Sequence, residues 1–171
     1  MWRGKELTMT LTRYDYDPVN HRVAFRGSPC VPTRMAWEVK HAIHLQLRSI
    51  SEGSDTAASF AKNVRGVGSA TQLFPVPGYP TATRSRHDPD FSFLHIVSRS
   101  SGISKYPGVI MEFSESDKTN LNKKDVEHLA RKYIRYSKGA VRAVVCVEIT
   151  YSKDEDGKKE KGKAELSVWR P

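Results

Sequence analysis

The near-continuous apolar run AVRAVVCVEITY (residues 140–151) constrains the fold of this chain more than any other segment. A strand with so few polar positions is buried on both faces, which is typical of the centre of a sheet. The runs DFSFLHIV (90–97) and GVIMEF (108–113) predict two neighbouring strands, and AELSVW (164–169) alternates as a final strand. We therefore expect a sheet with residues 140–151 as a central strand.

Two amphipathic helices are predicted from apolar residues that recur at spacings of three and four. The first covers about 34–51, opens at Pro32 and Thr33, and closes before Gly53. The second covers about 123–137, with Asn122 as its cap and Gly139 as its stop. Its apolar stripe consists of Val126, Leu129, Ala130, Tyr133 and Ile134.

The remaining segments indicate a hairpin and several loops. Residues 6–13 alternate with a period of two, and residues 22–26 supply a second short run, so together they predict an N-terminal hairpin. Within the Gly- and Pro-rich region 52–88, residues 69–76 are a candidate strand and residues 77–87 an exposed loop. The resulting order is hairpin, helix, about three strands, helix and two strands. This order predicts a chain that combines helices and strands (α/β in the broad sense), with the mixed sheet flanked by helices that is typical of α+β folds.

Length and charge limit the functional classes. The chain has 171 residues, so we expect residues 1–171 to form a single domain. Its 28 Lys and Arg against 19 Asp and Glu give a net charge of +9, which favours a polyanionic partner such as nucleic acid. No segment has the apolar length of a membrane span, and residues 1–13 lack the apolar core of a signal peptide. We expect an intracellular protein, nuclear or cytoplasmic, with no membrane partner.

Two acidic residues stand at the ends of neighbouring predicted strands. Glu112 directly follows the apolar residues 109–111, and Asp90 begins the preceding strand. If these strands pair, both carboxylates lie at one edge of the sheet, and their repulsion calls for a raised pKa, a cationic side chain or a divalent metal. Mg²⁺ or Mn²⁺ suits such oxygen ligands and can activate a water that attacks a phosphodiester. A turn-forming role for Asp90 and a cap or ion pair for Glu112 are the alternative interpretations.

Several segments resemble fungal proteins that carry a restriction-endonuclease-like domain of the PD-(D/E)XK nuclease superfamily, distantly similar to bacterial domains named as endonucleases. The resemblance rests on HDPDFSF (87–93), YPGVIMEFSES (106–116), the stretch 123–151 and KAELSVWRP (163–171), and it extends over the N-terminal residues 13–26. It implies a core of helix, three strands, helix and strand, with the hairpin and the final strand added. It also implies carboxylates that hold Mg²⁺ for phosphodiester hydrolysis.

The resemblance assigns roles to individual residues. Asp90 stands at the PD position and Glu112 at the (D/E) position, so both are expected to be catalytic and to bind the metal. Glu38 on the first helix matches an additional acid of many members, and the backbone carbonyl of Phe113 is expected to complete the metal shell. The motif lysine is replaced by Ser114.

A lysine is needed near the metal to orient the attacking water and to stabilise developing negative charge. Related domains move this lysine to the following helix, where Lys124 stands at the matching place and Lys123 is the alternative. Replacement of the motif lysine by serine leaves open whether the chain cleaves.

Cationic residues around the motif are candidates for phosphate contacts. Arg84 and Arg86 precede the PD position, and His128, Arg131 and Arg135 follow Lys124 at helical spacing as a basic stripe that is either a phosphate-binding surface or a solvated face. The sequence thus predicts a metal-dependent nuclease acting on DNA or RNA. The alternative is an inactive nuclease-fold module that binds nucleic acid or a protein. Many nucleases of this fold dimerise, so a homodimer is considered, although no motif marks its interface.

Overall fold

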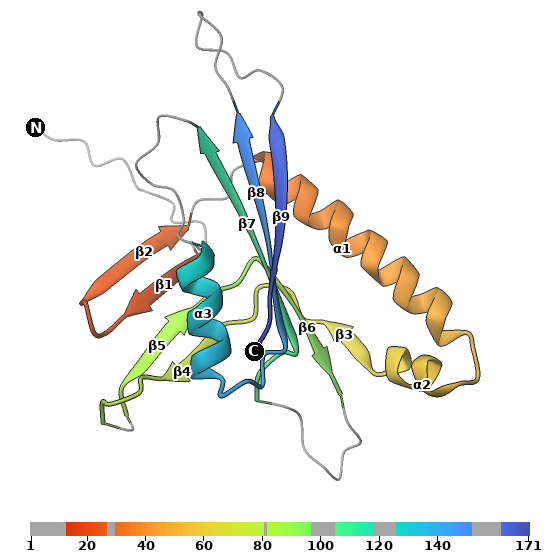
Figure 1. The fold of residues 1–171 in the computed structure, drawn as a ribbon, viewed down its shortest axis with the longest axis horizontal. Coiled ribbons are helices and arrows are strands. Elements are labelled where there is room, and N and C mark those ends of the chain that lie inside the picture. The colour runs from red at the N-terminus through yellow and green to blue at the C-terminus, as the bar shows by residue number, and fades with distance from the viewer. Residues whose placement is uncertain (1–12, 27–29, 81, 97–104, 118–125, 152–161) are drawn as a thin grey trace, which may run out of the picture.

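The computed structural model of the chain describes residues 13–26, 30–80, 82–96, 105–117, 126–151 and 162–171. These residues form a mixed α+β structure in which two sheets are accompanied by helices (Figure 1). In chain order the elements are β1 (Arg13–Asp17), β2 (Arg22–Arg26), α1 (Cys30–Ser51), α2 (Thr56–Lys62), β3 (Val64–Gly66), β4 (Gln72–Pro75), β5 (Arg84–His87), β6 (Phe91–His95), β7 (Val109–Asp117), α3 (Val126–Tyr136), β8 (Ala143–Tyr151) and β9 (Lys163–Trp169).

The larger sheet has the strand order β3-β6-β7-β8-β9. Strands β7 and β8 run parallel, and the other neighbours are antiparallel. The prediction that residues 140–151 contain a central strand is confirmed, because β8 pairs with β7 on one side and with β9 on the other. The expectation of a mixed sheet flanked by helices is confirmed as well, and the specific core of the resemblance remains an expectation.

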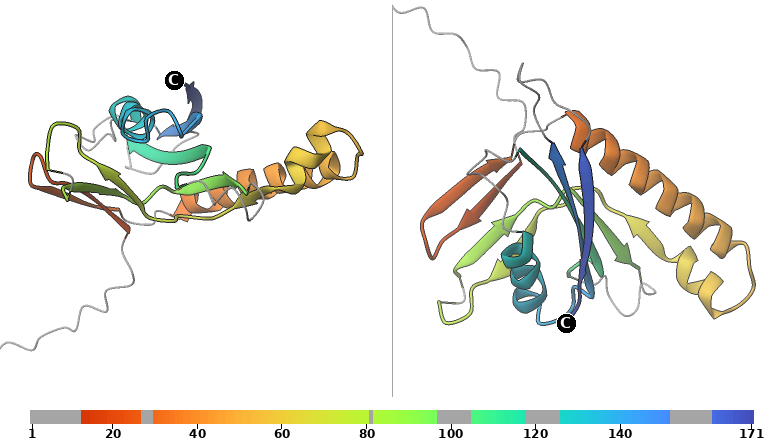
Figure 2. Two further views of the ribbon diagram at one scale, coloured as in Figure 1. Left: turned by 90° about the horizontal axis from the view of Figure 1, so that it is seen from below. Right: turned by 45° about the horizontal axis from the view of Figure 1, so that its top comes forward.

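Helices α1 and α3 lie on opposite faces of this sheet, as the left view of Figure 2 shows. Along β7, Met111 and Phe113 point to the face that α1 covers, whereas Ile110 points to the face that α3 covers. Most of the apolar stripe of each helix packs on the sheet: α1 contributes Met35, Ala36, Val39, Ile43 and Leu47, and α3 contributes Val126, Leu129, Ala130 and Tyr133. Ile50, which continues the predicted spacing of Val39, Ile43 and Leu47, is exposed instead. Both helices are therefore amphipathic in the predicted sense.

The smaller sheet, of order β2-β1-β5-β4, corrects the expectation of one sheet. The predicted loop 77–87 is wrong over Arg84–His87, because β5 pairs with β4 and touches β1 at Tyr16. Polar residues form this strand because tertiary contacts bury alternate side chains, namely Ser85 and His87. Neither α2 nor β3 was predicted; α2 is short and is capped by the Asp55 side chain.

The N-terminal hairpin is present, and the described part of its first strand is Arg13–Asp17, which extends beyond the predicted range 6–13. Residues 6–12 lie outside the described residues, so the alternation there is untested. Asp15 and Asp17 lie within β1, and Asp17 accepts hydrogen bonds from the backbone N–H groups of Val19 and Asn20 in the turn that follows. The turn itself therefore begins at Asp17.

Helix α3 is tied to the hairpin by one partly buried ion pair. The Lys132 Nζ atom lies 2.8 Å from Oδ2 of Asp17, and about a fifth of each side chain is exposed. Burial raises the pKa of Asp17, but the hydrogen bonds from Lys132 and Asn20 and the charge of Lys132 outweigh it and hold that pKa well below its usual value. This pair joins α3, which covers the larger sheet, to the smaller sheet.

Candidate active site

The structure brings Asp90 and Glu112 together at the end of the β6–β7 ladder. Phe91 pairs with Met111, and the antiparallel register places Asp90 opposite Glu112 one residue further on. The backbone N–H of Phe113 donates to Oδ2 of Asp90 at 2.6 Å. The two acids predicted to form a pair are therefore held in place by the strand register and by a hydrogen bond that links Asp90 to β7.

Glu112 is fully buried, and its side chain lies beneath α3. Strand alternation places Glu112 on the same face as Ile110, opposite to the α1 face. The hydroxyl of Tyr133 donates to Oε1 of Glu112 at 2.7 Å, and both side chains have 0% exposure. Because a buried carboxylate is costly without hydrogen bonds, this tyrosine is the local reason why an acid is tolerated directly after apolar residues. Its role was not visible in the sequence, where Tyr133 counted only as part of the apolar stripe.

The segment that carries Asp90 is fixed by the neighbouring aspartate. Asp88 is buried and accepts hydrogen bonds from the backbone N–H of Tyr14 and from the Thr71 hydroxyl, at 3.1 and 2.7 Å. Arg86 donates to the same carboxylate at 3.1 Å. Asp88 thus holds in place the connection between β5 of the smaller sheet and β6 of the larger sheet. Of the two aspartates in this connection, Asp90 is the one that contacts β7.

His87 is a second buried titratable residue that the sequence did not single out. Its ring lies 5.5 Å from the ring of Tyr133 and 6.0 Å from that of Phe74, and only 3% of the residue is exposed. Its Nδ1 atom lies 3.6 Å from Oδ1 of Asp15, and among the described residues neither ring nitrogen has a hydrogen-bond partner. The polar groups near Tyr133 therefore come from both sheets.

The structure does not unite all the acids that the resemblance named. Glu38 is exposed on α1, which packs on the face opposite to the Glu112 side chain. In the part of the chain that the structure describes, no three His, Cys, Asp or Glu side chains gather as metal ligands. Of the predicted metal ligands, Asp90, Glu112 and the backbone of Phe113 lie together.

The cation expected beside the acid pair is not supplied at the motif position. Ser114 is buried there, on the face of the sheet where Glu112 lies. Lys124 and its alternative Lys123 both lie outside the described residues. Their proposed role stays a prediction.

The predicted phosphate-binding residues differ in their surroundings. Arg86 pairs with Asp88 and stacks over the Tyr14 ring at 4.1 Å from its centroid, so it has a structural role. Arg84 is exposed on β5. On α3, His128 and Arg135 are exposed, and exposed Arg131 pairs with Glu127 at 2.7 Å.

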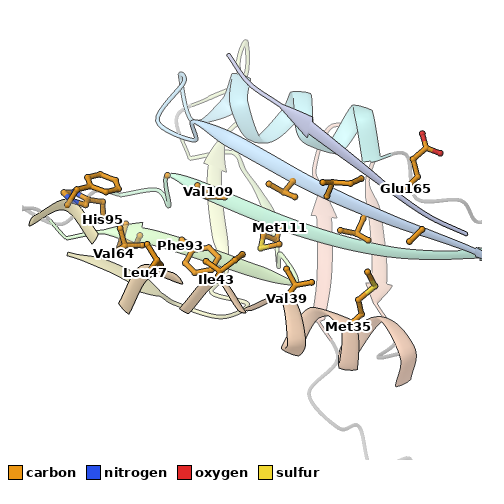
Figure 3. A pocket seen from close by; sticks show the side chains of 17 residues that line it. Met35, Val39, Ile43, Leu47, Val64, Phe93, His95, Val109, Met111 and Glu165 are labelled. Carbon is orange, nitrogen blue, oxygen red and sulfur yellow. The ribbon is translucent and has the colours of Figure 1, made fainter. Parts of the chain in front are cut away.

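A separate apolar groove of about 660 Å³ lies between α1, α2 and the larger sheet (Figure 3). Met35 and Leu47 of α1, Phe60 of α2 and Met111 and Val147 of the sheet are among its lining residues. These sheet residues point away from Glu112, so the groove and the acid pair occupy opposite faces. A site at the acid pair does not include this groove.

No protein-family model matches the sequence, and no curated protein shows a significant match to it. Among the described helices, none combines the length and the apolar character needed to cross a membrane.

Proposed function

We propose that the chain is a metal-dependent nuclease that hydrolyses phosphodiester bonds in DNA or RNA. The observation that carries the proposal is the position of Asp90 and Glu112 one residue beyond the Phe91–Met111 pair that ends the β6–β7 ladder, with the Phe113 N–H bound to Asp90. An excess of cationic residues, with a net charge of +9, fits a polyanionic substrate.

The arrangement of the elements supports the proposal. Along the chain, the larger sheet and its flanking helices read α1, β3, β6, β7, α3 and β8. This is the order helix, three strands, helix and strand that the resemblance implies, with α2 inserted before β3 and β4 and β5 inserted between β3 and β6. Strand β9 then adds the expected final strand at the edge.

The donor set fits Mg²⁺ or Mn²⁺, which take one or two carboxylates and otherwise keep water or phosphate oxygens. Asp90, Glu112 and the carbonyl of Phe113 would hold the ion, which supplies a Lewis acid and an acidified water when bound. Asp90 is partly exposed and would be the carboxylate that a substrate reaches, while Tyr133 donates to one oxygen of the buried Glu112. The predicted Lys124 would orient the water.

A second candidate function is a nuclease-fold module that binds nucleic acid or a protein without cleaving. Buried Ser114 at the lysine position favours it, because a serine hydroxyl carries no positive charge to offset the developing negative charge. The complete burial of Glu112 also favours it, since that carboxylate already has the hydroxyl of Tyr133 as a partner.

Cleavage assays separate the two candidates. The wild type and the Asp90→Asn and Glu112→Gln variants are incubated with single- and double-stranded DNA and RNA in Mg²⁺, Mn²⁺ or EDTA. The nuclease predicts metal-dependent cleavage that each substitution lowers by about a hundredfold or more. The matched control is Glu52→Gln, an exposed acid beyond the end of α1.

Binding assays complete the test. Fluorescence anisotropy with labelled oligonucleotides in Ca²⁺ reports affinity without turnover. Wild-type binding without cleavage supports the module, and cleavage that survives both substitutions refutes the assigned site. Lys124→Ala and Lys123→Ala, measured side by side, identify which of the two lysines, if either, turnover depends on.

A further inference from the structure

The two edges of the larger sheet are unequal. Strand β3 at one edge has three residues, whereas β9 at the other edge has seven and pairs with β8 along its whole length without a bulge. Among the described strands, none lies on the outer side of β9 (Figure 1). A long, regular edge strand presents backbone N–H and C=O groups to which another strand can add.

One face of β9 exposes apolar side chains, whereas the charged Lys163 and Glu165, of the kind that often protects an edge strand, lie on the other face. Leu166 is 66% exposed and Val168 49% exposed, and both lie on the face that α1 shares, opposite Val147 and Val145 of β8. Leu166 is one of the residues that line the apolar groove. The Glu165 carboxylate points away from that groove (Figure 3). No proline interrupts residues 163–169.

We propose that β9 is an interface for a second copy of this chain, with the two β9 strands paired antiparallel about a two-fold axis at Leu166. This is the one two-fold register that pairs all seven residues of β9. The proposal rests on the edge of the sheet and is independent of whether the chain cleaves nucleic acid.

The sequence of β9 is complementary to itself in this register. Leu166 meets its own copy, and Ala164 meets Val168 of the second copy, so one face gains a continuous apolar row. On the other face Glu165 meets Ser167 of the second copy, and Lys163 meets Trp169 of the second copy, where an ammonium over an indole is favourable.

Neighbouring registers are less favourable. A two-fold axis at Glu165 places the two glutamates directly opposite each other, which is destabilising for like charges. An axis at Ser167 shortens the overlap and places Lys163 opposite Pro171, which has no N–H to donate. Both the charges and the backbone hydrogen-bonding groups therefore favour the register with its two-fold axis at Leu166.

Cysteine cross-linking tests the register directly, in a Cys30→Ser background. Leu166→Cys is expected to give a disulfide-linked dimer under mild oxidation, because the two Cβ atoms of a residue on the axis are about 5 Å apart. Val168→Cys is the matched control on the same face. Its copy would lie about 13 Å away, four residues at about 3.3 Å each, too far for a disulfide.

Sedimentation of the full chain tests the dimer itself. The wild type is expected to dimerise with concentration, and Leu166→Lys is expected to weaken dimerisation by about tenfold or more through a buried charge at the centre of the interface. Leu45→Lys, at a leucine of similar exposure on α1, should leave it unchanged. A monomeric wild type, a Leu166→Lys variant that dimerises as the wild type does, or cross-linking of Val168→Cys as efficient as that of Leu166→Cys overturns the proposal.

Discussion

Tyr133→Phe removes a single hydroxyl from the most buried polar contact of the candidate site. The lost hydrogen bond joins Tyr133 to Oε1 of Glu112 at 2.7 Å, and neither side chain is exposed to water. A hydrogen bond to a charged group contributes about 1.5–3 kcal/mol, and water cannot replace it without entering the core. We therefore expect the variant to lose about 1.5–3 kcal/mol of unfolding free energy.

Thermal and urea unfolding measure this loss. For a chain of this length each kcal/mol corresponds to about 2–4 °C in Tm, so Tm should fall by about 3–12 °C. The matched control is Tyr136→Phe, which removes a hydroxyl from a partly exposed tyrosine at the end of the same helix. That variant should change the unfolding free energy by less than about 0.5 kcal/mol.

A double-mutant cycle isolates the interaction itself. Glu112→Gln keeps the shape of the side chain and removes its charge, so Tyr133→Phe should cost less in the Glu112→Gln background than in the wild type. We expect a coupling energy of about 1 kcal/mol or more, as for contacting groups. Equal costs of Tyr133→Phe in the two backgrounds, or a Tm equal to that of the wild type, would refute the view that Tyr133 stabilises the buried Glu112 carboxylate.

Three further variants test the framework around the site. Lys132→Met should lose about 1–2 kcal/mol of unfolding free energy near pH 7. The lowered pKa of Asp17 contributes stability above about pH 4, and this contribution disappears as the pH falls through the pKa of the folded state. The difference in unfolding free energy between the variant and the wild type, measured in urea titrations, should therefore shrink between about pH 5 and pH 2. Gly66→Ala should lower Tm, because an added Cβ would lie 2.8 Å from the ring of Phe91, and an unchanged Tm would contradict this close packing. Asp88→Ala should lose about 1–3 kcal/mol of unfolding free energy, because the Tyr14 N–H, the Thr71 hydroxyl and Arg86 all lose their shared acceptor. A loss below about 1 kcal/mol would show that Asp88 does not hold the connection between the two sheets in place.

The parts of the fold that could be predicted are those whose side-chain pattern is set within one element. Val39, Ile43 and Leu47 repeat at helical spacing, and they are among the residues that α1 packs on the sheet. The apolar run of β8 likewise showed a central strand. From such strands the meeting of Asp90 and Glu112 could be inferred, because it needs only that β6 and β7 be neighbours.

The parts that could not be predicted depend on contacts between elements. Strand β5 consists of polar residues, and His87 is buried only because Phe74 and Tyr133 pack around it. Asp15 of β1 accepts a hydrogen bond from the backbone N–H of Asp88, which is 73 residues away in the sequence, so no local pattern reveals this contact. In the same way, the helical pattern marks Tyr133 as apolar and contains no sign that its hydroxyl meets a carboxylate.

The geometry of α3 separates two parts of the predicted site. Tyr133 faces the sheet and binds Glu112, whereas His128, Arg131 and Arg135 recur at three and four residues on the exposed side of the same helix. A helix with its side chains is about 10 Å across, so a nucleic acid lying along this basic stripe would have its phosphates at least that far from Glu112. One phosphate therefore cannot contact the stripe and the acid pair at the same time. A nuclease built on this fold has to bind the scissile phosphate from the side where Asp90 is exposed, and the stripe can hold only a flanking part of the substrate. If the stripe is instead the main binding surface, binding is uncoupled from Asp90 and Glu112, which is the behaviour of the non-cleaving module.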